Sequence, residues 1–396
     1  MTETGGEAIV LTLNSGSSSL KFGLYRAGMS RTETLLTGEA DSIGEDAGQI
    51  RARDARGKAL TTSTVAIRDQ LDAIVQIERL RADSKLPSPT AVGHRIVHGG
   101  PKLRRHCIVD DEVMQRLDAA VPFAPLHLPP ALAIIRSARE IFPTLPHMAC
   151  FDTTFHADLP DVARVLSLPK ELRVSGIQRY GFHGLSCESI LHQLGNDVPD
   201  HVVIAHLGNG ASVTAVKGGK SVDTSMGLTP TGGVIMGTRS GDLDPGVLIY
   251  LAREKNLDAA ILEDLVDRRS GLLGISGVSS DMRQLQQSAR SNPDARLAID
   301  MFCYSVRKQI AAMIAALEGI DLIVFTGGIG ENDEHVRALI CAGLAWTGIG
   351  LDEVRNQAAN NPISDSNLPC RVLVLPSQED EQIARHSWAL FPQRTV

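Results

Sequence analysis

The distribution of apolar residues along the chain predicts alternating strands and amphipathic helices. Apolar runs followed by glycine and small polar residues are typical of buried strands that end in a loop, and five segments show this pattern: AIVLTLNSG, HMACFDTT, HVVIAHLGNG, DLIVFTGG and RVLVLPSQE. In α/β sheets, ligands bind beyond the carboxyl ends of the strands, because loops and helix N-termini meet there. The pattern therefore predicts an α/β protein with one cleft lined by both halves of the chain.

The clearest helical pattern lies between Leu297 and Leu317, and we interpret it as core. Its apolar positions recur at helical spacing, at Phe302, Val306, Ile310, Met313 and Leu317. We expect Gly319 to end this helix. In PLHLPPALAIIRSA, Pro129 or Pro130 is expected to open another helix, since proline is tolerated in the first turn.

Two segments about 190 residues apart share one plan. VLTLNSGSSSLKFGLY and VIAHLGNGASVTAVKGGK each consist of an apolar strand, a turn of glycine and small polar residues, and a return strand. In the first return strand, Leu20, Phe22 and Leu24 point one way by period two, and Ser19 and Lys21 point the other. The similarity predicts a duplicated domain, with chance likeness of glycine-rich hairpins as the alternative.

Composition restricts the class of protein. A length of 396 residues favours two or three domains, and 43% apolar with 21% charged residues is an ordinary globular mixture. The net charge of -7 argues against a protein built mainly to hold nucleic acid or an anionic membrane. The N-terminus lacks a signal-peptide pattern, and no apolar run approaches the roughly 20 residues of a membrane span. Six dispersed cysteines without a CxxC pair indicate reduced thiols in the cytoplasm rather than a zinc site.

The glycine-rich loops do not fit two familiar nucleotide motifs. GGKS at 218–221 resembles the end of a Walker A motif, but that motif needs glycine where this chain has Thr214. GGIGEN fails as a dinucleotide fingerprint because the third glycine falls at Asp333. These mismatches exclude two ways of binding a nucleotide, and they leave both ATP and NAD open.

Charged residues stand in or beside the small-residue loops. GHRIVHGG contains Arg95 and MGTRSGDLDP contains Arg239, and an arginine in such a loop is suited to bidentate contact with a phosphate or carboxylate. The alternative is an arginine that caps a helix or pairs with a surface acid. Asp152 ends an apolar strand, which favours a catalytic or metal role. His183 and His206 each lie near glycine, and two histidines in such loops favour function over a structural role.

Nine segments, taken in order, resemble the acetate kinase family across nearly the whole chain: LNSGSSSLKF, GHRIVHGG, FDTTFH, RYGFHG, HLGNG, DTSMGLTP, MGTRSGDLDPG, ISGVSSDMR and FTGGIGEN. The resemblance implies an α/β fold of two duplicated actin-like (ribonuclease H-like) domains around a nucleotide cleft. It implies an N-terminal lobe of residues 1–152 plus 381–396, whose last part is a returning helix. A C-terminal lobe of residues 153–380 is expected to carry the nucleotide-binding loops.

The resemblance implies a cytoplasmic transferase in acetyl-CoA biosynthesis that catalyses ATP + acetate ⇌ ADP + acetyl phosphate. Magnesium is the expected metal, with manganese as a substitute, and a homodimer is the expected assembly. No nucleic acid or membrane partner is expected. Two alternatives stay open. One is a kinase for propionate or another short-chain fatty acid, and the other is a non-catalytic, nucleotide-binding actin-like protein, for which the paired Arg95 and Arg239 would have no use.

Site roles are carried over from the family residue by residue. Arg95 and Arg239 would flank the acetate carboxylate and the transferring phosphoryl group. His183 would hydrogen-bond a transition-state oxygen, and Asp152 would orient the surroundings of the attacking carboxylate or help to hold the metal. The magnesium-linked positions match Asn14 and Glu379. The apolar pocket for the acetate methyl group matches Val97, Leu126, Phe182 and Pro230. The phosphate positions match His206, Asn209 and Gly210, with Ser17, Ser19 and Lys21 as further phosphate neighbours. The adenosine and ribose positions match Asp281, Arg283, Gly327, Gly328, Ile329, Gly330 and Asn332.

The chain also departs from the family pattern at several positions. Leu185 and Cys187 stand where threonine and histidine are usual, and Leu128 replaces a common asparagine. Gln378 and Asp380 stand where NEE is usual. The Cys187 change lies one helical turn from His183, so we expect it to alter the support of that histidine and hence the rate or its pH dependence. Activity is still expected, because the five predicted charged catalytic and metal residues are all present.

Overall fold

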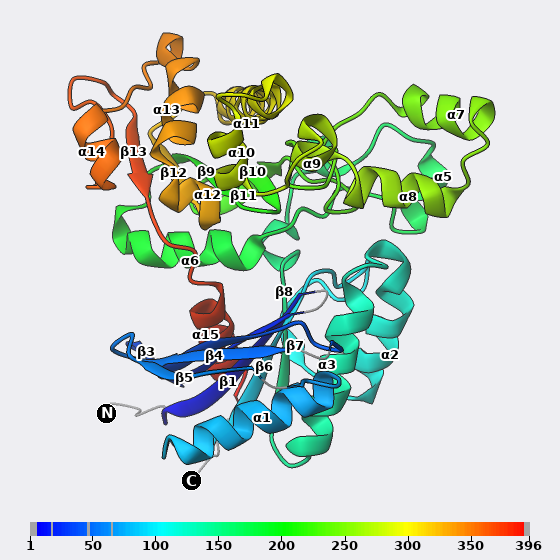
Figure 1. The fold of residues 1–396 in the computed structure, drawn as a ribbon, viewed down its shortest axis with the longest axis vertical. Coiled ribbons are helices and arrows are strands. Elements are labelled where there is room, and N and C mark those ends of the chain that lie inside the picture. Colours follow the sequence, from blue (N-terminus) through cyan, green and yellow to red (C-terminus); the bar gives the residue numbers. More distant parts are fainter. Residues whose placement is uncertain (1–5, 17–18, 46–47, 65, 392–396) are drawn as a thin grey trace. The chain divides into compact units, whose positions relative to one another are not determined.

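The computed structural model divides the chain into two compact units (Figure 1). It describes residues 6–16, 19–45, 48–64 and 66–391, apart from the side chains of residues 62–64. Unit 1 consists of Met1–Ala157 and Gln378–Val396, and unit 2 of Asp158–Ser377. Among the described residues, none of the helices combines the length and the apolar character that a bilayer crossing requires.

Unit 1 contains one mixed sheet in the order β5-β4-β3-β2-β1-β6-β8-β7. Its strands are β1 (Ala8–Ser15), β2 (Leu20–Ala27), β3 (Thr32–Asp41), β4 (Gln49–Asp54), β5 (Ala59–Thr64), β6 (Ala91–Ile96), β7 (Cys107–Ile108) and β8 (His147–Phe151). The central strands are parallel: β1 pairs with β6, and β6 pairs with β8. Such parallel strands are usually covered by helices on both faces, and the helices of unit 1 do this.

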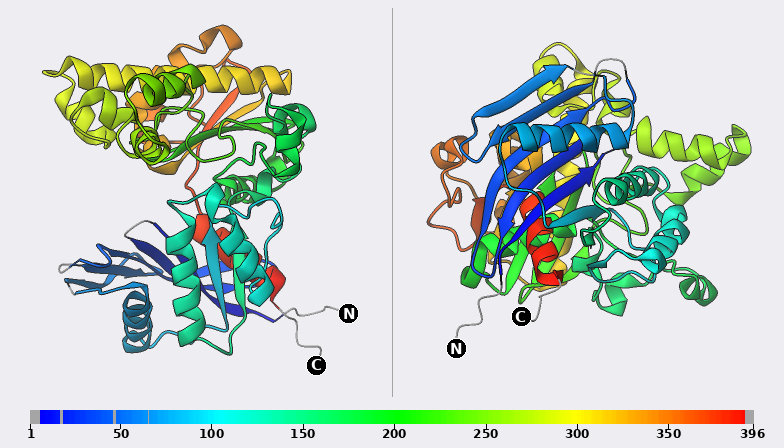
Figure 2. Two further views of the ribbon diagram at one scale, coloured as in Figure 1. Left: turned by 90° about the vertical axis from the view of Figure 1, so that its right-hand side faces the viewer. Right: turned by 90° about the horizontal axis from the view of Figure 1, so that it is seen from below.

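The helices of unit 1 are α1 (Gln70–Asp83), α2 (Asp111–Ala120), α3 (Leu128–Ile141) and α15 (Glu379–Leu390), with short 3-10 turns η1 (Val121–Phe123) and η2 (Thr154–His156). Helices α1 and α3 share a core with Leu11 and Leu13 of β1. Helix α15 packs with Ala8 and Val10, which point to the other face by period two. Figure 2 shows α15, in red, lying against the strands of this sheet. As predicted, a proline (Pro129) occupies the first turn of α3, although Leu128 is its first residue.

Unit 2 contains a second sheet in the order β11-β10-β9-β12-β13. Its strands are β9 (His201–Leu207), β10 (Ala211–Lys217), β11 (Lys220–Thr224), β12 (Leu322–Thr326) and β13 (Arg371–Val374). Its helices are α4 (Asp161–Arg164), α5 (Lys170–Val174), α6 (Gly184–Leu194), α7 (Pro245–Glu254), α8 (Ala259–Arg268), α9 (Gly271–Ser276), α10 (Met282–Ser288), α11 (Pro293–Leu317), α12 (Gly327–Asn332), α13 (Glu334–Ala342) and α14 (Glu353–Ala358), with 3-10 turns η3 (Gly195–Asp197) and η4 (Ala345–Thr347). Helix α11 packs on β9, β10 and β11.

The two sheets confirm the predicted internal repeat. In unit 1, β3, β2 and β1 form antiparallel pairs, and β6 and β8 continue from β1 in parallel. In unit 2, β11, β10 and β9 form antiparallel pairs, and β12 and β13 continue from β9 in parallel. Five strands therefore have the same order and the same directions in both units, and the two similar sequence segments are the β1–β2 and β9–β10 hairpins.

The structure confirms Leu317 as the last residue of the long helix α11 and corrects its start. The apolar positions predicted from its periodicity are all buried. However, the helix begins at Pro293, because the side chain of Asn292 accepts hydrogen bonds from the N–H groups of Asp294 and Ala295. The residue that takes the left-handed conformation at its end is Glu318, with φ 63°, and not Gly319. The N–H of Gly319 still bonds to the carbonyl oxygen of Ile314.

Candidate active site

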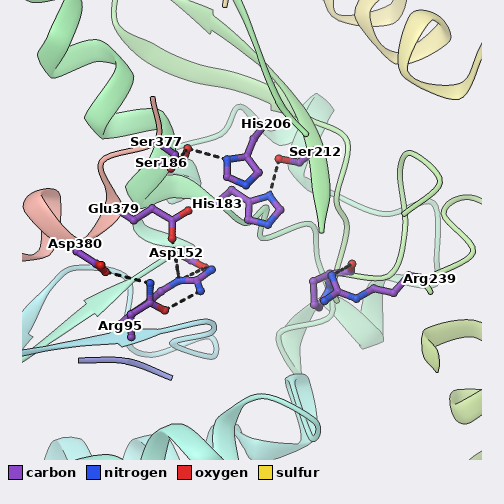
Figure 3. A network of polar contacts seen from close by, with 12 residues as sticks. Arg95, Asp152, His183, Ser186, His206, Ser212, Arg239, Ser377, Glu379 and Asp380 are labelled. Carbon is purple, nitrogen blue, oxygen red and sulfur yellow. Dashed lines mark hydrogen bonds and ion pairs between the residues drawn. The ribbon is translucent and has the colours of Figure 1, made fainter. Parts of the chain in front are cut away.

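The carboxyl ends of the central strands of unit 1 hold a group of charged and polar side chains (Figure 3). Arg95, on β6, donates from Nη2 to Asp152 Oδ2 at 2.7 Å and from Nε to both oxygens of Asp152 at 3.2 and 3.1 Å. It also donates from Nη1 to Asn14 Oδ1 at 3.0 Å. Asp152 follows β8 and is buried, and Asn14 is at the end of β1. Parallel pairing of β1, β6 and β8 therefore brings three predicted site residues together.

The Arg95 guanidinium is oriented but keeps donors for a ligand. Its bonds to Asp152 and Asn14 use Nε–H, one hydrogen of Nη1 and one of Nη2, which leaves two of its five N–H groups without a partner among the described residues. Burial opposes the charge, but the attraction of Asp152 and Glu379 outweighs it and raises the pKa of Arg95. The group is therefore a fixed cation, suited to an anion that approaches from one side.

Two adjacent carboxylates at the start of α15 complete this group. Glu379 Oε2 lies 3.8 Å from Arg95 Nε, and Asp380 Oδ1 accepts a hydrogen bond from Asn14 Nδ2 at 3.2 Å. Burial raises the pKa of Asp380, and the neighbouring Glu379 raises it further against the opposing hydrogen bond from Asn14. Two carboxylates and an amide oxygen are the donor set that Mg²⁺ prefers, and their mutual repulsion is what a divalent cation relieves. The residues present therefore fit the predicted metal.

In unit 2, a pair of stacked histidines lies at the N-terminus of α6 and the end of β9. The rings of His183 and His206 are 4.2 Å apart between centroids, with an interplanar angle of 22°. His183 Nδ1 hydrogen-bonds at 2.9 Å to Oγ of Ser212, which pairs with His206 across the β9–β10 hairpin. The backbone of His183 is left-handed, with φ 57°, which is uncommon for residues other than glycine and often marks a functional position.

His206 is held on its other side by two serines. Its Nδ1 hydrogen-bonds to Ser186 Oγ at 2.8 Å, and Ser377 Oγ donates to Ser186 Oγ at 3.0 Å. Ser186 lies on α6 and is completely buried, whereas Ser377 follows β13. Figure 3 shows this line of side chains separately from the bond between His183 and Ser212. The imidazoles of His183 and His206 therefore each hydrogen-bond to a serine hydroxyl group within unit 2.

Arg239 and the loop after β9 lie on the same side of this histidine pair. A side chain added at Gly210 would place its Cβ 3.3 Å from His183 Nε2 and 3.5 Å from Arg239 Nη1. The N–H of Gly237 donates to the carbonyl oxygen of Asn209 at 3.0 Å, so the two glycine loops are joined. Unit 2 therefore brings together four predicted residues, which are His183, Asn209, Gly210 and Arg239.

The GGIGEN segment folds as a turn from β12 into α12. Gly327 has φ 79°, and a Cβ there would lie 2.7 Å from the carbonyl oxygen of Leu207, so glycine is required at this close approach to β9. The buried Arg337 donates from Nη1 to the carbonyl oxygens of Gly330 and Glu331 at 2.9 and 3.0 Å. Asn332 Nδ2 donates to the carbonyl oxygen of Gly328. The segment is thus the short helix α12, and hydrogen bonds from Arg337 and Asn332 hold its backbone.

The two remaining adenosine-site predictions lie on the surface. Asp281 caps α10, and its carboxylate accepts from the backbone N–H and the guanidinium of Arg283. Those hydrogen bonds lower the pKa of Asp281. Helix α10 is joined to α13 by a hydrogen bond of 2.7 Å from Gln286 Nε2 to Asp333 Oδ2, and Asp333 is the residue directly after GGIGEN. This bond places α10 beside the GGIGEN loop.

The other predicted residues are divided between the units. Val97 and Leu126, predicted to contact the acetate methyl group, are half-buried in unit 1, whereas Phe182 and Pro230 are buried in unit 2. Lys21 is exposed and pairs with Asn14 across the β1–β2 hairpin, and the backbone oxygen of Ser19 accepts from Gly16 at 2.8 Å. Ser17 lies outside the described residues. Gly328 is exposed and Ile329 half-buried, both on α12.

Several side chains that contact the predicted residues were not identified from the sequence. They are Ser186, Ser212, Glu331, Arg337, Ser377 and Asp380. Ser212 could have been identified from the sequence, because it lies two residues beyond Gly210 on the return strand and so faces the same side as the loop. Asp380 had a weaker signal as a second acid beside Glu379. Ser186 and Ser377 had none, because their contact joins positions 191 residues apart.

Three of the departures from the family pattern are buried, whereas Gln378 and Asp380 are half-buried. Leu185 and Cys187 are both buried on α6, and the N–H of Cys187 donates to the carbonyl oxygen of His183 at 3.0 Å. Leu128 is buried at the start of α3. Gln378 stands at the N-terminus of α15, where Arg385 donates to its side chain at 3.5 Å.

Comparisons with known proteins agree with this geometry. Residues 9–385 match the model of the Acetokinase family. The chain is 43% identical to an acetate kinase from Methylocella silvestris, over 97% of this chain and 98% of that protein, and 41% identical to one from Campylobacter lari, over 97% and 100%. Among solved structures, it is similar to a propionate kinase from Francisella tularensis (TM-score 0.91, 34% identity, 97% and 100% coverage) and an acetate kinase from Porphyromonas gingivalis (0.85, 33%, 97% and 99%). The resemblance predicted from the nine segments is confirmed, and the chain belongs to the acetokinase family.

Proposed function

We propose that this protein transfers the γ-phosphoryl group of ATP to acetate, reversibly, and forms ADP and acetyl phosphate. The observation that carries the proposal is the Arg95 group, in which one guanidinium is fixed by Asp152 and Asn14 and keeps two N–H donors for an anion. A protein that only binds and releases a nucleotide has no use for such a carboxylate site in addition to Arg239. The membership of the acetokinase family supports the same reaction.

The proposed chemistry needs no general base. A carboxylic acid titrates near pH 4, so acetate is already ionised at neutral pH. One carboxylate oxygen of acetate forms a bond to the γ-phosphorus, and the bond from that phosphorus to the bridging oxygen of ADP breaks. ADP leaves with the electron pair of that bond. Catalysis then consists of positioning and of stabilising negative charge on the transferring group.

In this proposal, each of the four residues Arg95, Asp152, His183 and Arg239 has one task. Arg95 binds the acetate carboxylate, and Asp152 holds the guanidinium in place. Arg239 and His183 stabilise the oxygens of the transferring phosphoryl group. The glycine loop at Gly210 admits phosphate oxygens close to the backbone, because a side chain there would fill that space.

Mg²⁺ would be held by Glu379 and Asn14, with Asp380 placed to support them. Bound Mg²⁺ supplies positive charge that neutralises the phosphate oxygens. Asn14 is oriented by bonds from both ends of its amide, since Oδ1 accepts from Arg95 and Nδ2 donates to Asp380. The surface pair of Asp281 and Arg283, the α12 residues 327–330 and Asn332 would bind adenosine and ribose, and His206 with Asn209 the phosphates. Ser19 and Lys21, together with Ser17, are proposed as further phosphate neighbours.

Propionate is the second candidate substrate, because a propionate kinase is among the similar solved structures. Val97, Leu126, Phe182 and Pro230 are proposed to surround the methyl group of the substrate. One methylene in an apolar pocket is worth only about 1–3 kcal/mol, so acceptance of propionate at reduced efficiency is expected. A smaller residue at position 97 would leave room for the additional methylene of propionate. Because this chain has the branched Val97 there, we propose acetate as the preferred substrate.

We also propose that the protein forms a homodimer, and the surface of α7 and α8 supports this. Neither helix contributes a buried residue, although both are rich in apolar side chains. Val247, Ile249, Tyr250 and Ile261 are exposed there. An apolar surface of this kind is characteristic of protein interfaces. Ile249→Asp is expected to convert the dimer into a monomer in light-scattering measurements, and a wild-type monomer would refute this assembly.

The proposed location is a reducing compartment such as the cytoplasm. All six cysteines are free thiols, and five of them are buried. Burial raises the pKa of Cys341 and Cys370 to about 12, so these thiols stay protonated and unreactive.

The direct test is formation of acetyl phosphate, detected as acetohydroxamate after reaction with hydroxylamine. Acetate, propionate and butyrate are compared as acceptors, and ATP and pyrophosphate as donors, with Mg²⁺, Mn²⁺ or a chelator. We expect product with acetate, ATP and Mg²⁺, less with propionate, and none with chelator. Arg239→Ala, purified in parallel, excludes a contaminating kinase if it makes no product. Absence of product from the wild-type protein with every acid would overturn the proposal.

A further inference from the structure

We propose that Ser377 and Ser186 form a hydroxyl relay that fixes the tautomer of His206, and that Glu331 anchors this relay. The relay consists of Ser377, Ser186 and His206, and all of its members lie in unit 2. Its geometry stands on the contacts within that unit alone. Its effect on turnover rests on the proposed kinase function.

The direction of the hydrogen bonds determines the tautomer. Ser377 Oγ donates to Ser186 Oγ at 3.0 Å, so the Ser186 oxygen already accepts one hydrogen bond along this line. The single hydroxyl hydrogen of Ser186 is then available to His206 Nδ1, which lies 2.8 Å away. An imidazole nitrogen that accepts a hydrogen bond carries no hydrogen. In the proposed relay Ser186 donates this hydrogen to Nδ1, and neutral His206 then carries its own hydrogen on Nε2.

Ser377, the first member of the relay, is held in position by Glu331 of the GGIGEN segment. One oxygen of Glu331, Oε1, accepts from the N–H of Ser377 at 2.9 Å and from the N–H of Gly327 at 3.0 Å. Gly327 begins α12, and the residue before it, Thr326, offers no side-chain cap. Glu331 therefore satisfies the first N–H of its own helix and fixes the segment after β13 in the same contact.

Two further contacts make this anchor rigid. The backbone oxygen of Glu331 accepts from Arg337, whose guanidinium also donates to the backbone oxygen and the side chain of Asn356. The carbonyl oxygen of Pro376, directly before Ser377, accepts from Gln193 Nε2 on α6 at 2.9 Å. Helix α6, which carries Ser186, is thereby fixed to the segment that carries Ser377. The relay thus links GGIGEN, α6 and the end of β9.

The tautomer determines what His206 offers to a nucleotide phosphate. With the hydrogen on Nε2, the ring is a hydrogen-bond donor toward phosphate oxygens. With the hydrogen on Nδ1, a lone pair of Nε2 would face those oxygens and repel them. A fixed donor needs no reorientation when a phosphate arrives, which is the condition for electrostatic preorganisation. Ser377, Ser186 and Glu331 are therefore positioning residues, and only His206 is proposed to touch the nucleotide.

The relay is tested by the nitrogen spectrum of histidine in the full-length protein without substrates. ¹⁵N-labelled wild-type protein is compared with Ser186→Ala, Ser377→Ala and the control Ser189→Ala, and the signal is assigned with a His206→Gln variant. Ser189 is a matched control, because it is buried on the same helix and its hydroxyl donates to the backbone oxygen of Ser186. We expect the Nε2–H tautomer of His206 in the wild type and in Ser189→Ala, and a mixture of tautomers in the two relay variants.

Two results would overturn the relay. One is a wild-type His206 with its hydrogen on Nδ1, and the other is an unchanged tautomer in a folded Ser377→Ala protein. Because Ser377 is only partly buried, that variant keeps the test decisive if Ser186→Ala does not fold. Glu331→Ala is expected to behave like Ser377→Ala, whereas Glu331→Gln retains an oxygen acceptor and is expected to restore the wild-type tautomer.

Kinetics provide a second, separable readout. If the proposed reaction is correct, kcat of Ser377→Ala falls about five- to tenfold, the factor for one hydrogen bond of average net strength, with the KM for acetate changed less than about twofold. Ser189→Ala is expected to keep wild-type turnover. If the wild-type protein makes no acetyl phosphate but shows the fixed tautomer, the kinase proposal fails and the relay stands. If Ser377→Ala shows the expected mixture of His206 tautomers but an unchanged kcat, the relay has no role in catalysis.

Discussion

The two sheets have the same strand order, but the residues at their carboxyl ends belong to different chemical classes. In unit 1, Asn14 ends the first central strand, and Arg95 follows His94, the parallel partner of Leu13. In unit 2, the equivalent positions are His206 and its parallel partner Thr326. Unit 1 therefore places a fixed cation where unit 2 has a neutral hydroxyl. Topology determines where the site residues stand, and the side chains at those positions determine what they bind.

The third central strand extends this comparison. Asp152 lies two residues beyond Cys150, which pairs with Arg95. Ser377 lies three residues beyond Val374, which pairs with Phe325, the residue before Thr326. Asp152 and Ser377 therefore occupy the same structural position. Asp152 orients an arginine in unit 1, and Ser377 begins a line of neutral hydrogen bonds in unit 2. The difference predicts that the strand ends of unit 1 are sensitive to loss of charge, and that the turn from β12 into α12 in unit 2 is sensitive to changes of backbone shape.

The largest effect is expected from removing the cation of unit 1. Arg95→Ala deletes the proposed carboxylate donor together with its hydrogen bonds to the buried Asp152, so kcat/KM for acetate should fall by about 10³-fold or more. Arg51→Ala is the matched control, because Arg51 forms an exposed pair with Asp41 at 2.7 Å on the same sheet. Its effect on turnover should be negligible. A loss of less than tenfold in Arg95→Ala, measured in the hydroxamate assay, would contradict the charged role of unit 1.

A smaller effect is expected at the proposed metal position. Glu379→Gln removes one of two adjacent carboxylates while it keeps the shape of the side chain. We expect the Mg²⁺ concentration for half-maximal rate to rise about 10- to 100-fold, and the rate to recover partly at high Mg²⁺. Glu381→Gln on the same helix, where Glu381 pairs with Arg385 at 2.9 Å, should keep the wild-type Mg²⁺ dependence. An unchanged dependence in Glu379→Gln would place the metal elsewhere.

In unit 2, a substitution that leaves every charge intact should still weaken nucleotide binding. Gly327→Ala forces a left-handed alanine and brings its Cβ to 2.7 Å from the carbonyl oxygen of Leu207. We expect the Kd for ADP to rise about tenfold, and the melting temperature to fall by a few degrees. Gly218→Ala separates the two causes, because Gly218 also has a positive φ of 55° but nothing lies within 4 Å of its Cβ. If the Kd for ADP and the melting temperature change equally in both variants, backbone strain alone explains the effect.

The smallest expected effect is a loss of stability at low pH, which arises from two buried histidines of unit 1. His147 Nε2 lies 3.1 Å from the carbonyl oxygen of Phe142, to which it donates, so its Nδ1 accepts from His94 Nε2 at 3.0 Å. Burial lowers the pKa of both histidines, and His147 lowers that of His94 further. The unfolded chain then binds more protons than the native state, so stability falls as the pH drops below about 6.5.

The expected loss is about 1 kcal/mol per pH unit and per histidine in that window. Thermal denaturation between pH 7.5 and 5 measures it. His94→Gln should flatten the slope, whereas replacement of the surface His335 by glutamine should leave it unchanged. A wild-type slope that persists in His94→Gln would assign the effect to other groups.

Local sequence patterns predicted the fold well because the strands are short, apolar and followed by glycine. The β1–β2 and β9–β10 hairpins, which show the duplication, were visible as repeated segments. Asp152 could be singled out because it follows an apolar strand. Arg95 was singled out as an arginine in a loop of small residues, whereas the structure places it on strand β6. The first residue of α11 was misplaced because its cap, Asn292, precedes the apolar pattern.

Contacts between distant positions were not predictable. Ser186 and Ser377 meet only because α6 and the segment after β13 pack together, and no periodicity or motif links them. The same holds for Asn14 and Asp380, which are separated by 366 positions and meet because α15 returns to the sheet of unit 1. Serine and aspartate in loops have many ordinary roles, so their residue types carried no signal without the fold.

The central claim is that Arg95 and its neighbours at the strand ends of unit 1 serve the acceptor and the metal, whereas α12 and the glycine loops of unit 2 bind the nucleotide. Calorimetric titration of ADP, without Mg²⁺, into the Arg95→Ala protein tests it most directly. The account predicts a Kd within about threefold of the wild-type value, despite the large loss of turnover. A Kd raised by more than about tenfold would show that Arg95 serves nucleotide binding, and would contradict the division between the two units.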